Sequence, residues 1–354
     1  MSLHNTLFSE ALELLKKLIS IPSFSKEENL TADAIQEFLQ KRNIPTHRTM
    51  NNVWAKNKHF SPDLPTILFN SHHDTVKPNG GYTRNPFLPE IIDGKLYGLG
   101  SNDAGGCLVS LLATFCYFCE RENLQYNFII AATAEEEISG LNGIELIYPE
   151  LGNIDFAIVG EPTLMNLAVA EKGLMVLDCV AVGKSGHAAR EEGVNALYAA
   201  MKDIDWFRTY QFDRVSEHLG KVKMTVTMIQ AGTQHNVVPD KCYYVVDVRI
   251  TDKYTHEEVL EIIRQNVQST VTPRSMRARS SSISMEHPIV QAGLKLGRTT
   301  YGSPTSSDQA LIPVTSIKIG PGDSARSHTA DEFIYVDEIK EGIELYCAML
   351  EQIV

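Results

Sequence analysis

The sequence is poor in positive charge. Its 354 residues include 32 Lys plus Arg against 44 Asp plus Glu, which gives a formal net charge of −12. Nucleic-acid binding needs clustered positive charge, so we expect no nucleic-acid partner. The excess of acidic side chains leaves carboxylates that can bind cations.

Long apolar runs are also missing. Nowhere do 18 apolar residues follow one another, so we expect no membrane-spanning helix. The segment from Met1 to Leu15 carries acidic residues among its apolar ones and does not resemble a secretion signal. These features predict a soluble cytoplasmic protein without a membrane partner.

Cysteines are few, and the six present lie mostly in apolar runs. This usage is typical of small buried side chains in a reducing compartment and not of a disulfide framework. Cys116 and Cys119 form a C-x-x-C pair, but they continue a helical apolar pattern and no second pair exists, so we expect neither a zinc nor a redox site there.

Short apolar stretches bounded by turn residues predict buried strands, and amphipathic helices lie between some of them. We expect strands at 66–70, 127–133, 154–160 and 315–319, and helices at 7–19, 104–120 and 293–300. Residues 25–28 offer polar capping groups before a further helix that runs through Leu39. This alternation predicts an α/β fold whose catalytic domain contains a mostly parallel mixed sheet.

The pattern changes between residues 173 and 286. Strands at 174–182, 221–230, 241–250 and 278–285, with helices at 194–210 and 255–269, give the order βαββαβ, which is the ferredoxin-like pattern. We therefore predict a catalytic metal-binding domain of residues 1–172 and 287–354, interrupted by an inserted lid or dimerisation domain of residues 173–286.

Acidic and imidazole side chains follow several predicted strands. His72 and Asp74 come after the first strand, and a carboxylate two residues from a histidine can fix the tautomer of that ligand. Glu161 follows another strand, and His328 comes after the last one. Because the carboxyl ends of strands in an open α/β sheet converge, we expect these side chains to share one metal-binding cleft.

Asp103 lies in a glycine-rich turn that opens a helix, where an Asp serves equally well as a helix cap or as a bridging metal ligand. The surrounding glycines match neither G-x-G-x-x-G nor a phosphate loop, so we expect no nucleotide.

Three adjacent acids, Glu135, Glu136 and Glu137, directly follow the strand at 127–133. Such a run repels itself unless a cation compensates. Neighbouring side chains at a turn point in different directions, so one carboxylate can bind metal while another holds the attacking water, as metal-assisted hydrolysis requires.

Together these motifs resemble the zinc aminoacylase and carboxypeptidase family that includes acetylornithine deacetylase, succinyl-diaminopimelate desuccinylase and carboxypeptidase G. The resemblance covers nearly the whole chain. It implies that His72 and Glu161 hold one Zn²⁺, that Glu137 and His328 hold the other, and that Asp103 bridges the two. Co²⁺ or Mn²⁺ would fit the same ligands.

The resemblance further implies that Asp74 orients His72 and that Glu136 is the general base, with Glu135 as the fallback. His187 resembles the family's inserted-domain histidine, which stabilises the oxyanion in the active site of a partner subunit and so implies a homodimer. Asn236 and Arg249 match positions that contact substrate carboxylates. Lys172 is a plausible further partner, since cations pair with carboxylates.

The substrate expected from this resemblance is a small N-acyl amino acid. An acetyl or succinyl group would be removed from ornithine or citrulline, in arginine biosynthesis. A deacylase of lysine biosynthesis and a dipeptidase or aminopeptidase of the same family are the alternatives. A non-catalytic metal-binding regulatory protein is the alternative from another class.

Overall fold

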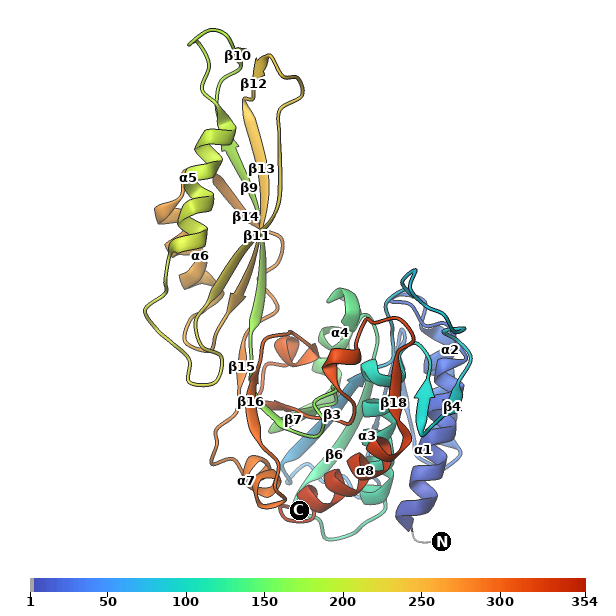
Figure 1. Cartoon of the computed structure of the whole chain (residues 1–354). Helices are drawn as coiled ribbons and strands as arrows, with labels where there is room; N and C mark the ends of the chain where they lie inside the picture. The colour runs from blue at the N-terminus through green and yellow to red at the C-terminus, as the bar shows by residue number, and fades with distance from the viewer. Residues whose placement is uncertain (1–2) are drawn as a thin grey trace. The chain divides into compact units, whose positions relative to one another are not determined.

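The computed structural model describes residues 3–354; Met1 and Ser2, which fall within the predicted catalytic domain, lie outside the described residues. The chain divides into two compact units (Figure 1). Unit 1 contains the chain up to Val169, together with Ser282–Tyr301 and Ser307–Val354, and unit 2 contains Ala170–Ser281 and Gly302–Ser306.

Unit 1 is built on a nine-stranded sheet in the order β1-β2-β6-β3-β7-β17-β8-β15, with β16 paired to β8. The central strands β6, β3, β7 and β17 are parallel to one another, whereas β2 joins β6, and β8 joins β17, in antiparallel fashion. The predicted α/β class with a mostly parallel mixed sheet is therefore confirmed. The strands are β1 (His47–Thr49), β2 (Asn52–Lys56), β3 (Thr66–His72), β6 (Asn127–Thr133), β7 (Phe156–Val159), β8 (Leu167–Glu171), β15 (Ser281–Ser282), β16 (Thr300–Ser303) and β17 (Ser316–Lys318).

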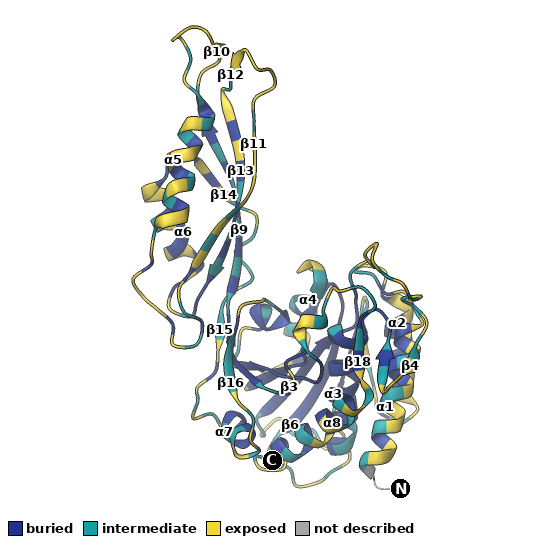
Figure 2. Ribbon diagram, in the orientation of Figure 1, coloured by how far each residue is buried: buried dark blue, intermediate teal, exposed yellow. Residues whose placement is uncertain are grey.

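Both faces of this sheet are buried, as Figure 2 shows for β3 and β6. Ile67 and Phe69 pack into a core with the helices on one side, whereas Leu68 between them packs with α4 on the other. A parallel sheet covered on both faces needs such continuous apolar strands. The helices are α1 (Leu3–Ile19), α2 (Asn29–Gln40), α3 (Gly106–Cys119), α4 (Ile144–Leu151), α7 (Pro288–Lys295) and α8 (Val336–Leu350), and a small sheet adds β4 (Glu90–Ile92), β5 (Lys95–Tyr97) and β18 (Phe333–Tyr335).

Helix α3 is the most apolar helix of unit 1. Together with the turn before it, this helix spans Ser101–Cys119 and is long and apolar enough to cross a membrane. However, 83% of the apolar stretch is buried inside the protein. Cys116 and Cys119 lie on this helix as free thiols, and burial raises the pKa of Cys116 to about 12. A thiol so rarely ionised is a poor metal ligand or nucleophile.

Unit 2 contains a four-stranded antiparallel sheet in the order β11-β13-β9-β14. Its elements follow one another as β9 (Gly173–Val182), α5 (Ala196–Thr209), β11 (Lys223–Ala231), β13 (Lys241–Ile250), α6 (His256–Asn266) and β14 (Thr270–Pro273), with a short pair β10 (Gly186–His187) and β12 (Val237–Val238). The predicted βαββαβ order is present.

Two predicted elements were misplaced. The last strand of unit 2 is β14 (Thr270–Pro273) and not 278–285, where only the short β15 forms, in the other sheet. Helix α7 starts at Pro288 and not at residue 293, because the His287 side chain caps it at that point. Helix α2 starts after Glu28, as predicted, but the Glu28 side chain does not cap it and accepts hydrogen bonds from the Lys26 N–H and the Asn51 amide instead.

Candidate metal centre

His72 is the central residue of the site. It ends β3 and is almost fully buried, and its Nε2 faces three carboxylates. The distances are 3.3 Å to Asp103 Oδ1, 3.7 Å to Glu161 Oε1 and 3.8 Å to Glu136 Oε2. Burial alone would lower the pKa of His72, but the surrounding carboxylates raise it well above its usual value.

Asp103 connects the two histidines. Its Oδ1 lies 3.3 Å from His72 Nε2 and its Oδ2 lies 3.5 Å from His328 Nε2. His328 Nε2 also lies 2.9 Å from Glu137 Oε2. The structure thus brings together all five predicted metal ligands. Two overlapping groups of residues, His72–Asp103–Glu137 and His72–Glu136–Glu161, have side-chain atoms close enough to one another to hold a metal ion.

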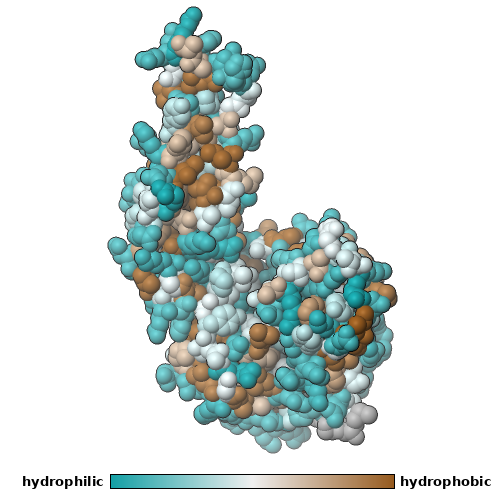
Figure 3. Space-filling model, viewed as in Figure 1, coloured by the Kyte–Doolittle hydropathy of each residue, from teal (hydrophilic) through white to brown (hydrophobic). Residues whose placement is uncertain are grey.

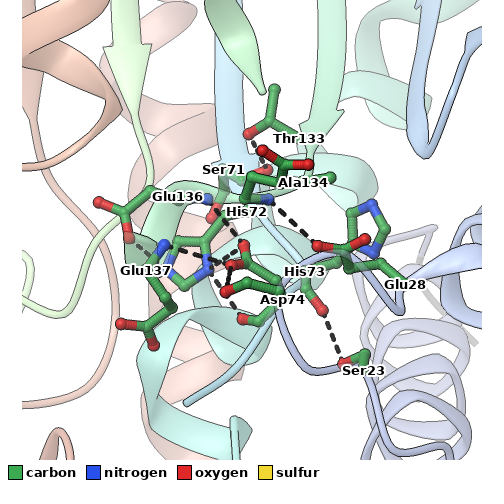
Figure 4. A network of polar contacts seen from close by, with 12 residues as sticks. Ser23, Glu28, Ser71, His72, His73, Asp74, Thr133, Ala134, Glu136 and Glu137 are labelled. Carbon is green, nitrogen blue, oxygen red and sulfur yellow. Dashed lines mark hydrogen bonds and ion pairs between the residues drawn. The ribbon is translucent and has the colours of Figure 1, made fainter. Parts of the chain in front are cut away.

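Asp74 is completely buried beside these ligands. The His72 Nδ1 lies 3.0 Å from the backbone carbonyl of Asp74 and 3.4 Å from its carboxylate. The carboxylate itself accepts hydrogen bonds from the N–H groups of Glu136 (3.1 Å) and Glu137 (3.2 Å) and from Ser25 Oγ (2.7 Å). Asp74 therefore holds the backbone of both glutamates beside His72, as Figure 4 shows.

The three adjacent glutamates point in different directions. Glu135 has a left-handed backbone conformation, and its carboxylate accepts a hydrogen bond from the Asn142 amide. Glu136 instead faces His72, and burial raises its pKa well above the usual value. Of the two predicted candidates for the base, only Glu136 lies in the ligand groups.

The cluster fits divalent cations. Among residues 3–354, the carboxylates of Asp103, Glu136 and Glu137 form no ion pair with Lys or Arg. Buried carboxylates at such short separations repel one another unless positive charge compensates. Imidazole with carboxylate, and no cysteine, is a ligand set that suits zinc, cobalt or manganese.

Two buried acids near the site were not predicted. Glu332 accepts hydrogen bonds from the N–H groups of Gly100, Asn102 and Asp103 and so fixes the turn that presents Asp103. Asp308 accepts a 2.6 Å hydrogen bond from Thr133 Oγ1 at the end of β6. Burial raises the pKa of Glu332 to about 8 and that of Asp308 to about 6. An acid four residues after His328 was the only sequence signal for Glu332.

The four remaining predicted residues belong to unit 2, and they form two pairs. Lys172 and Arg249 lie at one end of β9, where the positive charges of Lys223 and Arg249 add to burial in lowering the pKa of Lys172. Both are already engaged, because Lys172 Nζ donates to the Lys221 carbonyl and Arg249 forms a two-pronged ion pair with Asp247.

His187 and Asn236 form the second pair, beyond the other end of β9. His187 lies in β10, which pairs with β12, and the Ala188 N–H donates to the Asn236 carbonyl at 2.9 Å. The ten residues of β9 separate the two pairs. At about 3.3 Å per residue this is roughly 30 Å, so one copy of unit 2 cannot bring both pairs to one small substrate.

Comparison with known proteins gives a consistent result. The sequence profile of peptidase family M20/M25/M40 matches residues 68–352, which include every predicted metal ligand. A succinyl-diaminopimelate desuccinylase from Orientia tsutsugamushi is 26% identical over 293 residues, covering 77% of this chain and 74% of its own. A [LysW]-lysine/[LysW]-ornithine hydrolase from Saccharolobus solfataricus is 26% identical, covering 97% and 96%.

Solved structures share the fold. An aminopeptidase PepT from Bacillus cereus superposes with a TM-score of 0.78 at 18% identity, covering 98% of both chains. A Bacillus subtilis protein described as a dinuclear metal-binding peptidase of the M20 family superposes with a TM-score of 0.75 at 16% identity, again covering 98% of both.

Proposed function

This chain belongs to peptidase family M20/M25/M40, and we propose that it is a zinc-dependent hydrolase that removes an acyl group from the amine of an amino acid. The observation that carries the proposal is the convergence of the five candidate ligands, with one further and partly buried glutamate, Glu136, beside His72. Ligands and a separate base are the components of metal-assisted hydrolysis.

Two divalent ions in this site would supply an activated water and polarise the substrate carbonyl. His72 and Glu161 would hold one ion, Glu137 and His328 the other, with Asp103 between them. Glu136 would take the proton of the attacking water and return it to the leaving amine. Its raised pKa suits this role, because a base works best when its pKa is near the working pH.

The relatives shift the expected substrate. Their names concern the hydrolysis of succinyl-diaminopimelate and of LysW-linked lysine or ornithine, and neither of these two relatives is an acetylornithine deacetylase. We therefore place acyl derivatives of the lysine-biosynthetic amino acids diaminopimelate and lysine first, and the arginine-biosynthetic substrates acetylornithine and acetylcitrulline second. A screen that crosses acetyl and succinyl groups with diaminopimelate, lysine, ornithine and citrulline separates them.

The test of the reaction is Glu136→Gln, assayed with saturating Zn²⁺. Loss of a general base lowers turnover by about 10² to 10⁴-fold. Glu135→Gln is the matched control, because its carboxylate is turned to Asn142 and we expect turnover near that of the unmodified protein. Equal activity of both variants would remove Glu136 as the base.

An unblocked alanyl-glycine dipeptide tests the peptidase alternative in the same assay. Preference for this dipeptide over every N-acyl amino acid would replace the deacylase by a dipeptidase. Hydrolysis of none of them, with zinc or cobalt bound, would favour a non-catalytic metal-binding protein.

A homodimer through unit 2 is part of this proposal. Strand β11 lies at an edge of the sheet, and exposed apolar side chains lie on it and on neighbouring strands, where Figure 3 shows apolar surface: Met228 (63% exposed), Ile229 (51%), Tyr243 (50%) and Val182 (64%). Unpaired edge strands readily accept another strand. A second copy would also let His187 and Asn236 serve a substrate held by the partner.

Mixing two inactive variants tests this directly. His187→Ala and Glu136→Gln chains, refolded together, would form mixed dimers in which one of the two sites carries both intact residues. Recovery of activity supports the exchange. A monomeric mass by light scattering at full activity would reject it.

A further inference from the structure

A groove lies in unit 1 along the outer face of α8. It has a volume of about 470 Å³, within the range of small-molecule sites. Apolar side chains line part of it, and the residues that decide its charge are Arg298, Glu338, Glu341 and Glu344. None of these four is among the candidate metal ligands.

Arg298 is the unusual member of this groove. Its Nε is shielded from solvent and has no hydrogen-bond partner, and its guanidinium forms no ion pair among residues 3–354. A guanidinium charge without a partner is best satisfied by a carboxylate, which can accept hydrogen bonds from the terminal nitrogens of the side chain. The groove therefore offers a site for one carboxylate.

The acids of α8 give the complementary part. Glu338 is neutralised by two hydrogen bonds from Arg326, at 2.7 and 2.9 Å. Glu341 and Glu344 are exposed and form no ion pair among the described residues. They are three residues apart on one helix, so their side chains are neighbours on the same face. The unpaired charges of the groove are thus one positive and two negative.

We infer that this groove binds a free diamino monocarboxylic acid, such as lysine or ornithine. Its single carboxylate would pair with Arg298, its two ammonium groups with Glu341 and Glu344, and its aliphatic chain would lie against the apolar lining residues Leu164 and Leu345. This ligand carries the inverse of the charges of the groove. The inference concerns a second site and does not depend on the reaction proposed above.

The groove wall is continuous with the segments that hold the metal ligands. The N–H of Leu164, three residues after Glu161, donates to the Gly322 carbonyl at 2.7 Å. Asp323, the next residue, exchanges two 3.0 Å hydrogen bonds with Asn102, which precedes Asp103. A ligand in the groove would contact Leu164, close in sequence to Glu161, and Gly322, which adjoins the residue bonded to Asn102.

Calorimetric titration of the metal-loaded protein with L-lysine tests the inference. L-Norleucine lacks the side-chain ammonium and 1,5-diaminopentane lacks the carboxylate, so each probes one half of the charge pattern. We expect L-lysine to bind at least about tenfold more tightly than either, since hydrogen bonds between charged groups typically have this effect on affinity.

Arg298→Met and the double variant Glu341→Gln/Glu344→Gln complete the test. Both should weaken L-lysine binding about tenfold or more while leaving turnover at the metal centre in place, which shows that the variants are folded. No binding of L-lysine, equal binding of the three probes, or binding unchanged by Arg298→Met would overturn the inference. The last result would place the amino acid at the metal centre instead.

Discussion

Replacing Asp74 by Asn is the sharpest test of how the metal centre is held. The carboxylate accepts the N–H of Glu136 at Oδ1 and that of Glu137 at Oδ2. An amide has only one oxygen, so in either orientation its NH₂ group faces one of these two donors. One buried N–H then loses its acceptor, at a cost of about 1–3 kcal/mol.

A second loss concerns the metal. The Asp74 carboxylate lies 3.4 Å from His72 Nδ1, and removal of its charge makes the imidazole a weaker ligand. Changes in such outer partners typically cost 10- to 100-fold in metal affinity, or about 1.4–2.7 kcal/mol. We expect Asp74→Asn to show both effects, a lower free energy of unfolding without metal and weaker Zn²⁺ binding.

Urea unfolding of the metal-free protein and Zn²⁺ competition against a chelator measure the two effects separately. Ser25→Ala is the matched control, because it removes another donor to Asp74 but leaves the charge beside His72. This control should cost about 1 kcal/mol in stability and little in Zn²⁺ affinity. If Asp74→Asn bound Zn²⁺ within twofold of the unmodified protein, the role given to Asp74 would be refuted.

Three further predictions concern buried and titrating groups. Glu332→Ala leaves three N–H groups without an acceptor and should lower the free energy of unfolding by about 3 kcal/mol or more. Glu332→Gln keeps one oxygen as an acceptor, so its cost, measured by urea unfolding, should be less than half of that. The hydrogen bond to Glu137 raises the pKa of His328 to about 9, whereas a metal binds only the neutral imidazole. Zn²⁺ affinity should therefore rise from pH 7 to 9. Binding should also release a proton, which calorimetry in buffers of different ionisation enthalpy can count. The pKa of Asp308 is raised from 3.8 to about 6, so its contribution to stability is present below about pH 4 and is lost as the pH rises through 6. Since one pKa unit corresponds to about 1.36 kcal/mol, Asp308→Asn should stabilise the metal-free protein by on the order of 3 kcal/mol at pH 8 and have little effect at pH 4. Equal effects at both pH values would contradict the raised pKa.

Much of the fold could be predicted because its signals are local. The continuous apolar strands β3 and β6 are recognisable from a few residues each, and the alternation in β13 between buried Tyr244 and exposed Tyr243 marks a sheet with one open face. The last strand of unit 2 was misplaced because Thr270–Pro273 is short, whereas the Ser-rich stretch after it contains similar residues. Only pairing with β9 decides between the two.

The site was predictable where acids follow strands. Glu332 and Asp308 were not, because each acts through partners more than 170 positions away in the sequence, and a buried acceptor of N–H groups has no local pattern. For Lys172, Arg249, His187 and Asn236, the assignments as substrate or oxyanion contacts stay predictions.

The order of the ligands along the chain has a consequence for synthesis of the protein. His72, Asp103, Glu137 and Glu161 all precede unit 2, whereas His328 follows it, 167 positions after Glu161. A chain emerging from the ribosome therefore carries an unfinished cation site until nearly its whole length has been translated. Because domains tend to fold in the order of their synthesis, metal binding at full affinity should report that the C-terminal segment with His328 has docked.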